Sequence, residues 1–196
     1  MLNYWYAPQA KVNTVDTINT NAGDNITLTT IVSGAQNHYV WFKDGVQIPG
    51  APDSPNYVIN NVNSCDVGVY HSEIRSDLVP FDNANAPGTS GKNLLLVRND
   101  ITLNVAYTTS CTTLNSPTNG ATNVPINSGI SWNESLGACG YFVSIGTTPG
   151  GTNIANNVNV VDATNYNLGV NFPANTEIYI TITPYFQTGT ALVCSS

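Results

Sequence analysis

Short runs of alternating apolar and polar residues constrain the fold of this chain more than any other feature of its sequence. The runs are bounded by Gly, Pro, Asn and Asp, and no stretch keeps helical periodicity over three turns. Alternation with a period of two is typical of half-buried β-strands, and the bounding residues are those that form turns. The chain is therefore predicted to be all-β. The predicted strands cover residues 26–32, 39–43, 57–59, 67–74, 94–105, 129–132, 141–145, 165–168, 178–183 and 191–194.

Length and composition favour two domains. A chain of 196 residues suits two β-sandwiches of about 100 residues each. Charged residues make up only 9% of the chain, against roughly 25% in an average soluble domain, so Asn, Thr, Ser and Gly must supply its polar surface. The composition shifts after Val105, and residues 108–110 read as a linker. We therefore predict one sandwich at residues 1–106 and a second at residues 107–196.

The charge of the chain argues against several classes of partner. The net charge is −7, and the basic residues form no cluster. They are Lys11, Lys43, Arg75, Lys92 and Arg98. Nucleic acids and anionic membranes are both bound through basic surfaces. Since the chain has no such surface, we expect no nucleic-acid partner. No apolar run approaches the eighteen or so residues that span a bilayer, so we expect no membrane insertion either.

The four cysteines indicate disulfide bonds. They show no CxxC pair and no flanking His, which disfavours a zinc site. Disulfides form in oxidising compartments, so the chain is expected to be exported. Its first residues lack the charged and apolar segments of a signal peptide, which predicts that it is a fragment of a longer precursor.

Three motifs in the first half follow one another in the order and spacing of immunoglobulin-like domains. They are GDNITL at residues 23–28, WFKDG at 41–45 and DVGVY at 66–70. The first half therefore resembles an immunoglobulin-like domain. The resemblance implies that Trp41 is the buried tryptophan of strand C and that Tyr70 is the corner tyrosine of strand F. Thr30 and Ser72 stand where the family has its inter-sheet cysteines, so this sandwich is expected to close without that disulfide.

Residues 81–93, between the last two predicted strands of the first half, are rich in Pro, Gly and Asn. Immunoglobulin variable domains carry a binding loop at this place, and a loop of this length is often functional or mobile. Asn83, Asn85 and Lys92 are the candidate binding residues in it. The stretch GTSGK lacks the leading Gly and the following Ser or Thr of a phosphate loop, so nucleotide binding is rejected.

The second half carries a different set of motifs. They are PTNGATNVP at residues 117–125, ISW at 130–132, GYFVSIGTTPGG at 140–151 and YITITPY at 179–185. This half resembles the fibronectin type III-like domains of secreted and surface proteins of Bacteroidota, in which immunoglobulin-like segments often follow leucine-rich repeats. The resemblance implies a β-sandwich that serves as a module of a larger protein. The chain stops where the last strand, G, should begin, so that strand is expected to be truncated.

Period-two parity divides the second half into a core and an exposed face. Residues 141, 143 and 145 share one face with residues 178, 180 and 182 of the partner strand, and Trp132 and Tyr141 are the large members of this predicted core. The opposite face presents Phe142 and Tyr179. An aromatic pair exposed on a polar sheet could stack on a sugar or a partner chain, and packing against a neighbouring domain explains it equally well.

Two disulfide pairings are open for the second half. Cys111 and Cys194 should lie at the end of the sandwich where the chain enters, which makes their bond the preferred one. Cys139 should lie near the same end, so Cys139–Cys194 is the alternative. Cys65 has no evident partner in its own half.

Nothing in the sequence indicates catalysis. His38 and His71 are the only histidines and are expected on the surface, and neither a GxSxG nor an HExxH motif occurs. We therefore expect no enzyme activity, no cofactor and no metal. The predicted function is that of a spacer or adhesive segment of an exported surface protein, with a protein, a cell-surface glycan or neighbouring domains as partners. The alternatives are a carbohydrate-binding module and the accessory domains of an enzyme whose catalytic domain lies elsewhere.

Overall fold

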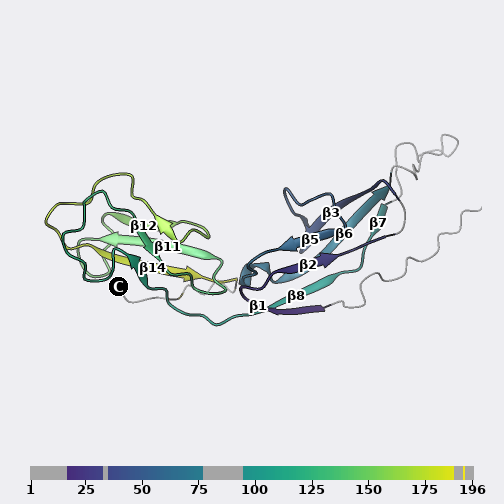
Figure 1. The fold of residues 1–196 in the computed structure, drawn as a ribbon, viewed down its shortest axis with the longest axis horizontal. Helices are drawn as coiled ribbons and strands as arrows, with labels where there is room; N and C mark the ends of the chain where they lie inside the picture. The colour runs from purple at the N-terminus through teal and green to yellow at the C-terminus, as the bar shows by residue number, and fades with distance from the viewer. Residues whose placement is uncertain (1–16, 33–34, 77–94, 188–191, 193–196) are drawn as a thin grey trace, which may run out of the picture. The chain divides into compact units, whose positions relative to one another are not determined.

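The computed structural model describes residues 17–32, 35–76, 95–187 and 192, and it divides into two compact units. Its regular elements are β-strands and one 3-10 helix, which confirms the predicted all-β fold class (Figure 1). The elements are β1 (Thr17–Asn21), β2 (Ile26–Thr29), β3 (Asn37–Lys43), β4 (Val46–Gln47), β5 (Asn56–Ile59), η1 (Ser64–Asp66), β6 (Gly68–Ser76), β7 (Leu95–Val97), β8 (Ile101–Ala106), β9 (Leu114–Ser116), β10 (Ile130–Trp132), β11 (Gly140–Gly146), β12 (Ala155–Asn159), β13 (Asn165–Tyr166) and β14 (Tyr179–Tyr185).

Unit 1 contains two sheets with the strand arrangement of an immunoglobulin-like sandwich. The larger sheet has the order β1-β8-β6-β3-β4, and β7 also pairs with β6; the smaller sheet pairs β2 with β5. The predicted strand at residues 94–105 is two strands, β7 and β8, which pair with successive parts of β6. Residues 98–100 interrupt it, although the Arg98 N–H still bonds to the Ser72 carbonyl.

Trp41 is the centre of the core of unit 1. It alternates with Tyr39 along β3, and both side chains are buried. Its indole N–H donates a hydrogen bond to the Ser54 carbonyl at 2.9 Å, so burial leaves no polar atom of Trp41 unpaired. Tyr57 lies against it at 5.6 Å between ring centroids, and the buried Tyr70 follows at 6.3 Å from Tyr57. These aromatic contacts fill the space between the two sheets.

Thr30 and Ser72 meet in this core. Their hydroxyl oxygens lie 2.7 Å apart and share one hydrogen bond, and both residues are buried. They are the positions at which immunoglobulin-like domains carry the inter-sheet cysteines. A hydrogen bond therefore joins the chain after β2 to β6 at the place where a disulfide joins the two sheets of immunoglobulin-like domains.

Replacing Ser72 with Ala should lower the free energy of unfolding of unit 1 by about 1–3 kcal/mol, because the Thr30 hydroxyl stays buried without a partner. The double variant Thr30→Val/Ser72→Ala removes both polar groups and should recover most of that loss. Urea denaturation of the two variants and the wild type measures the difference. A double variant less stable than Ser72→Ala would contradict this account.

Asp53 connects the loop after β4 to the start of β3. Its carboxylate bonds to the His38 ring at 2.6 Å and accepts the Tyr39 backbone N–H. The bond to His38, and then that to Tyr39, lowers the pKa of Asp53 below its ordinary value of 3.8. Because both side chains are about half exposed, solvent screens this contribution.

The stability of unit 1 should therefore depend on pH through Asp53. A carboxylate whose pKa is lower in the folded than in the unfolded state stabilises the fold above the unfolded pKa, and this contribution is lost as pH falls through the folded value. The free energy of unfolding should fall as pH drops from about 5 to below 3.8. Asp53→Asn should flatten this part of the profile, as measured by urea denaturation between pH 2.5 and 6 (roughly the range set by the carboxylate pKa). An unchanged profile in the variant would contradict this assignment.

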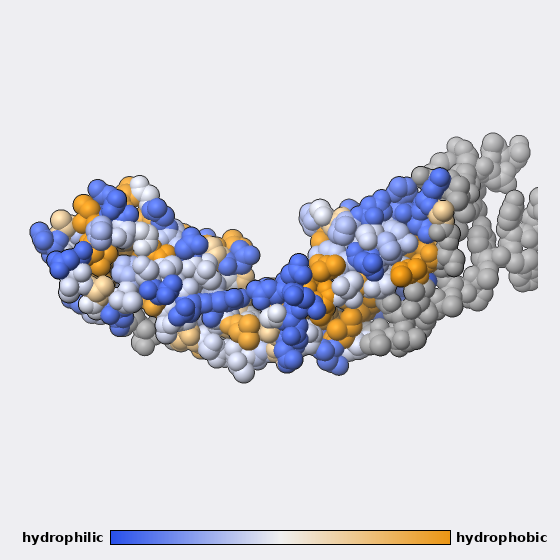
Figure 2. Space-filling view, in the orientation of Figure 1, coloured by the Kyte–Doolittle hydropathy of each residue, from blue (hydrophilic) through white to orange (hydrophobic). Residues whose placement is uncertain are grey.

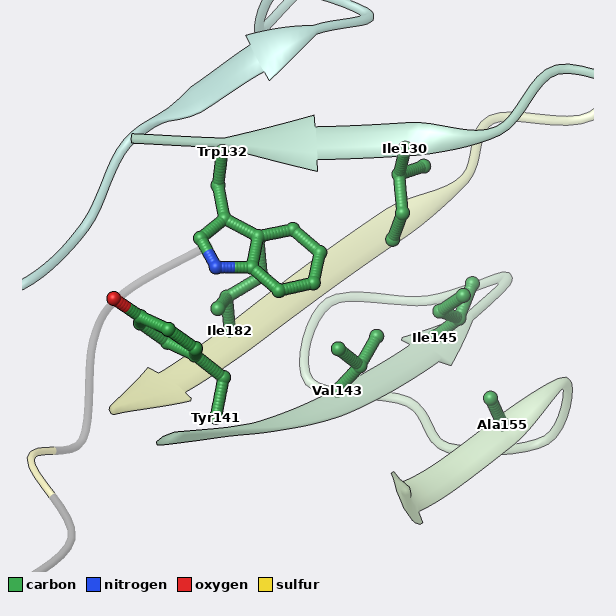
Figure 3. Packing of buried hydrophobic residues seen from close by; sticks show 7 residues of the cluster. All are labelled: Ile130, Trp132, Tyr141, Val143, Ile145, Ala155 and Ile182. Atoms are coloured by element: carbon green, nitrogen blue, oxygen red, sulfur yellow. The ribbon is translucent and has the colours of Figure 1, made fainter. Parts of the chain in front are cut away.

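Unit 2 packs two three-stranded sheets against each other. Their orders are β13-β10-β9 and β12-β11-β14. Trp132 of β10 meets Tyr141 of β11 edge to face at 5.6 Å, and Val143 and Ile145 continue the same row (Figure 3). Ile182 of β14 is buried beside them. All of these side chains come from alternate positions, which is why each sheet buries one face.

Unit 2 is assembled from three stretches of chain: residues 21–24, 61–67 and 105–196. The second stretch contains η1, which begins with a capping box between Asn63 and Asp66. Ser64 is fully buried in unit 2; its N–H bonds to the Gly137 carbonyl, and its hydroxyl oxygen accepts the Gln187 N–H. Gly137 has a φ of +84°, and a Cβ there would lie 2.5 Å from that of Tyr107, so only glycine fits.

A disulfide between Cys65 and Cys139 closes unit 2. The Ser64 hydroxyl lies 3.1 Å from the Cys139 sulfur, to which it donates because a disulfide sulfur has no proton. The alternative pairing Cys139–Cys194 is therefore wrong, because the Cys139 sulfur is already bonded. Cys111 is also disulfide-bonded, but Cys194 lies outside the described residues, so the Cys111–Cys194 pairing stays a prediction.

Candidate contact surface

The outer face of the sheet β12-β11-β14 is the candidate contact surface, and strand register defines its members. Tyr141, Val143 and Ile145 of β11 point into the core, so Phe142 and Ser144 between them point outward. On β14, Thr183 pairs with Phe142 and Thr181 with Ser144. On the other side of β11, Asn159 of β12 pairs with Phe142. A row of uncharged polar side chains thus surrounds Phe142.

Tyr185 extends this surface beside Phe142. It is the last residue of β14 and pairs with Gly140. A Cβ on Gly140 would lie 2.5 Å from the Tyr185 hydroxyl oxygen and 2.7 Å from its Cζ, so the phenol ring lies across the backbone of β11. The ring centroids of Tyr185 and Phe142 are 4.9 Å apart at an angle of 39°. Both residues are partly buried, so each keeps part of its ring exposed.

Asn159 completes the group with an oriented amide. Its side-chain oxygen accepts the Val161 N–H at 2.8 Å and lies 3.5 Å from the Tyr185 hydroxyl. A backbone N–H can only donate, so the atom facing it must be the amide oxygen. The amide nitrogen therefore points away from this turn, and it makes no hydrogen bond to the described residues.

The predicted pair Phe142 and Tyr179 is not a pair in the structure. Tyr179 lies on the same face but pairs with Gly146, four positions along β11 from Phe142. The Glu177 carboxylate accepts a hydrogen bond from the Tyr179 hydroxyl and raises the pKa of that phenol. The aromatic neighbour of Phe142 is Tyr185. The candidate binding residues Asn83, Asn85 and Lys92 lie outside the described residues.

Sequence reasoning missed Tyr185 and Asn159 for different reasons. The predicted strand ended at residue 183, one residue before Pro184, which has no N–H to donate to a neighbouring strand. The structure continues β14 through Pro184 to Tyr185, and extending the alternation by two residues would have placed Tyr185 on the same face as Tyr179 and Thr183. Asn159 belongs to β12, whose sequence ANNVN has little apolar alternation. No sequence signal identified that strand.

The four residues predicted for the cores, Trp41, Tyr70, Trp132 and Tyr141, are all buried and belong to no surface site. His38 is exposed, as its side chain is about half accessible. His71 is not the surface residue that was expected: its ring stacks on Phe42 at 4.9 Å, and 18% of its side chain is exposed. In the described part of the chain no three His, Cys, Asp or Glu side chains gather as a metal site would require. Within the same residues no helix has the length and apolarity to cross a membrane.

Hydrophobic residues do not form a broad patch on the face drawn in Figure 2. Among the described residues of that face they occur in small groups separated by hydrophilic ones. Single exposed apolar side chains such as Val46 and Val170 are ordinary on protein surfaces.

Comparison with known proteins gives limited similarity. No protein-family model matches the chain, and no curated protein matches it. Among solved structures it is similar to the FN1–FN3 domains of chicken CNTN1, with 16% sequence identity and a TM-score of 0.34. The match covers 93% of this chain, which spans 60% of the length of that structure.

Proposed function

We propose that this chain is a non-enzymatic contact and spacer segment of an exported bacterial surface protein. Its partners are neighbouring domains of the same protein or molecules at the cell surface. The Cys65–Cys139 disulfide carries the proposal, because it matches the use of cysteine in oxidising compartments. The resemblance of both halves to modules of secreted proteins supports the same conclusion.

The chemistry of the described residues also supports a contact role. Several hydrogen-bonded Asn and Asp side chains serve local turns and caps: Asp24 accepts the Asn21 N–H, and Asn153 accepts the Thr147 N–H. The outer face of the sheet β12-β11-β14 carries hydroxyl and amide side chains and the aromatic rings of Phe142, Tyr179 and Tyr185. Such groups suit reversible contacts with a partner.

Intact cells of the source organism provide the test. We expect an antibody raised against residues 1–196 to label unpermeabilised cells, and an added protease to remove that label. Peptide mapping of the native protein without reduction should recover Cys65 linked to Cys139. Labelling that requires permeabilisation, together with free thiols at both positions, would contradict the proposal.

A further inference from the structure

The ring of Tyr185 lies flat on the sheet, across the backbone of β11. Gly140 provides the space, since any side chain there would overlap the phenol. The Tyr185 hydroxyl reaches toward Asn159 on β12, on the far side of β11. One face of this ring lies against the backbone of β11 at Gly140, and the residue as a whole is only partly buried. It therefore presents a flat apolar surface whose position is fixed before any partner binds.

Phe142 widens this surface. Its ring is tilted by 39° from that of Tyr185, so the two rings form a shallow angle instead of a single plane. Thr183 and Asn159 flank Phe142 on the neighbouring strands. Aromatic rings bordered by hydroxyl and amide groups suit a ligand that has both C–H faces and hydroxyl edges.

The charge distribution excludes anionic ligands. Residues 105–196 contain no Lys or Arg, and their charged residues are Glu134, Asp162 and Glu177. An anionic ligand would be repelled and would find no cation to pair with. A neutral ligand faces neither cost, and the cross-strand neighbours of Phe142, Thr183 and Asn159, are uncharged.

We propose that Tyr185, Phe142 and Asn159 form a binding site for a neutral glycan, in which a pyranose ring stacks on Tyr185 and the Asn159 amide nitrogen donates to a sugar oxygen. This proposal rests on the contact role proposed above and specifies a neutral glycan as the partner. Stacking covers the exposed faces of two preorganised rings. The Val161 N–H fixes the orientation of the Asn159 amide, so its donor points outward without first breaking another hydrogen bond.

The site is tested by measuring how much of the whole chain is removed from solution by insoluble neutral polysaccharides. The probes are cellulose, chitin, xylan and starch. We expect at least one of them to retain the wild type, and Tyr185→Ala to weaken that binding about tenfold. Tyr185→Phe keeps the ring and should bind within about twofold of the wild type. Asn159→Asp keeps the oxygen that accepts the Val161 N–H and removes the amide donor, so it should weaken binding several-fold without disrupting the turn.

Tyr179→Ala is the matched control, because it removes an aromatic ring from the same face at the other end of the strands. It should bind like the wild type, and thermal unfolding should show that all variants are folded. Retention by none of the four probes overturns the glycan site, as does retention that Tyr185→Ala and Asn159→Asp leave unchanged. Self-association abolished by Tyr185→Ala would assign the surface to a second copy of this chain. None of these outcomes alters surface labelling of cells, so the contact role is tested separately.

Discussion

Replacing Cys139 with Ser should lower the free energy of unfolding of unit 2 by about 4 kcal/mol, because the bond to Cys65 closes a loop with a sequence separation of 74. Without the bond, the unfolded chain regains the conformational entropy that closure removes. Urea denaturation of wild type and variant under non-reducing conditions measures the effect.

Cys65→Ser and the double variant Cys65→Ser/Cys139→Ser are the controls. Either single substitution already opens the bond, so the double variant should lose little more than one single variant. Losses that add up across the two positions would show that each cysteine acts through its own packing and not through the disulfide. Single variants as stable as the wild type would show that the bond is absent from the folded protein.

Replacing Trp41 with Ala should lower the free energy of unfolding of unit 1 by about 3–5 kcal/mol, because it empties the centre of a closed core. The indole is fully buried and contacts Tyr57, so its loss leaves a cavity that the sheets cannot fill without moving. Denaturation of the variant, followed by circular dichroism, measures the loss.

Phenylalanine at the two buried tryptophans separates ring volume from hydrogen bonding. Trp41→Phe loses the bond from the indole N–H to the Ser54 carbonyl. Trp132→Phe loses no such bond, since the Trp132 indole N–H has no partner among the described residues. Trp132→Phe should therefore cost about 1 kcal/mol less than Trp41→Phe. Equal costs at the two positions would show that the Ser54 bond contributes nothing.

The sequence predicted what depends on local pattern. Alternation along β11 placed Tyr141 in one core, and the immunoglobulin-like motifs placed Trp41 in the other and Thr30 and Ser72 at the inter-sheet positions. The placement of each of these residues follows from the pattern of one strand or one motif, so it can be predicted without knowing the tertiary fold.

Features that depend on long-range contacts could not be predicted in the same way. The pairing of Cys65 with Cys139 follows from the burial of η1 in unit 2, and no local pattern marks residues 61–67 as part of that unit. The partner of Phe142 depended on whether β14 continues past Pro184. β12 was missed because its side chains are mostly amides, and its pairing with β11, not apolar alternation, makes it a strand.

The Cys65–Cys139 bond also decides how this chain would carry a mechanical load. Tension applied to its two ends follows covalent bonds, and the shortest covalent path jumps from Cys65 to Cys139. The strands β6, β7 and β8 lie between Cys65 and Cys111 in sequence and so lie off this shortest covalent path. With a sequence separation of 74, roughly 250 Å of extended chain cannot be pulled out while the bond is intact. As a spacer, the segment would therefore have a fixed limit to its length under force.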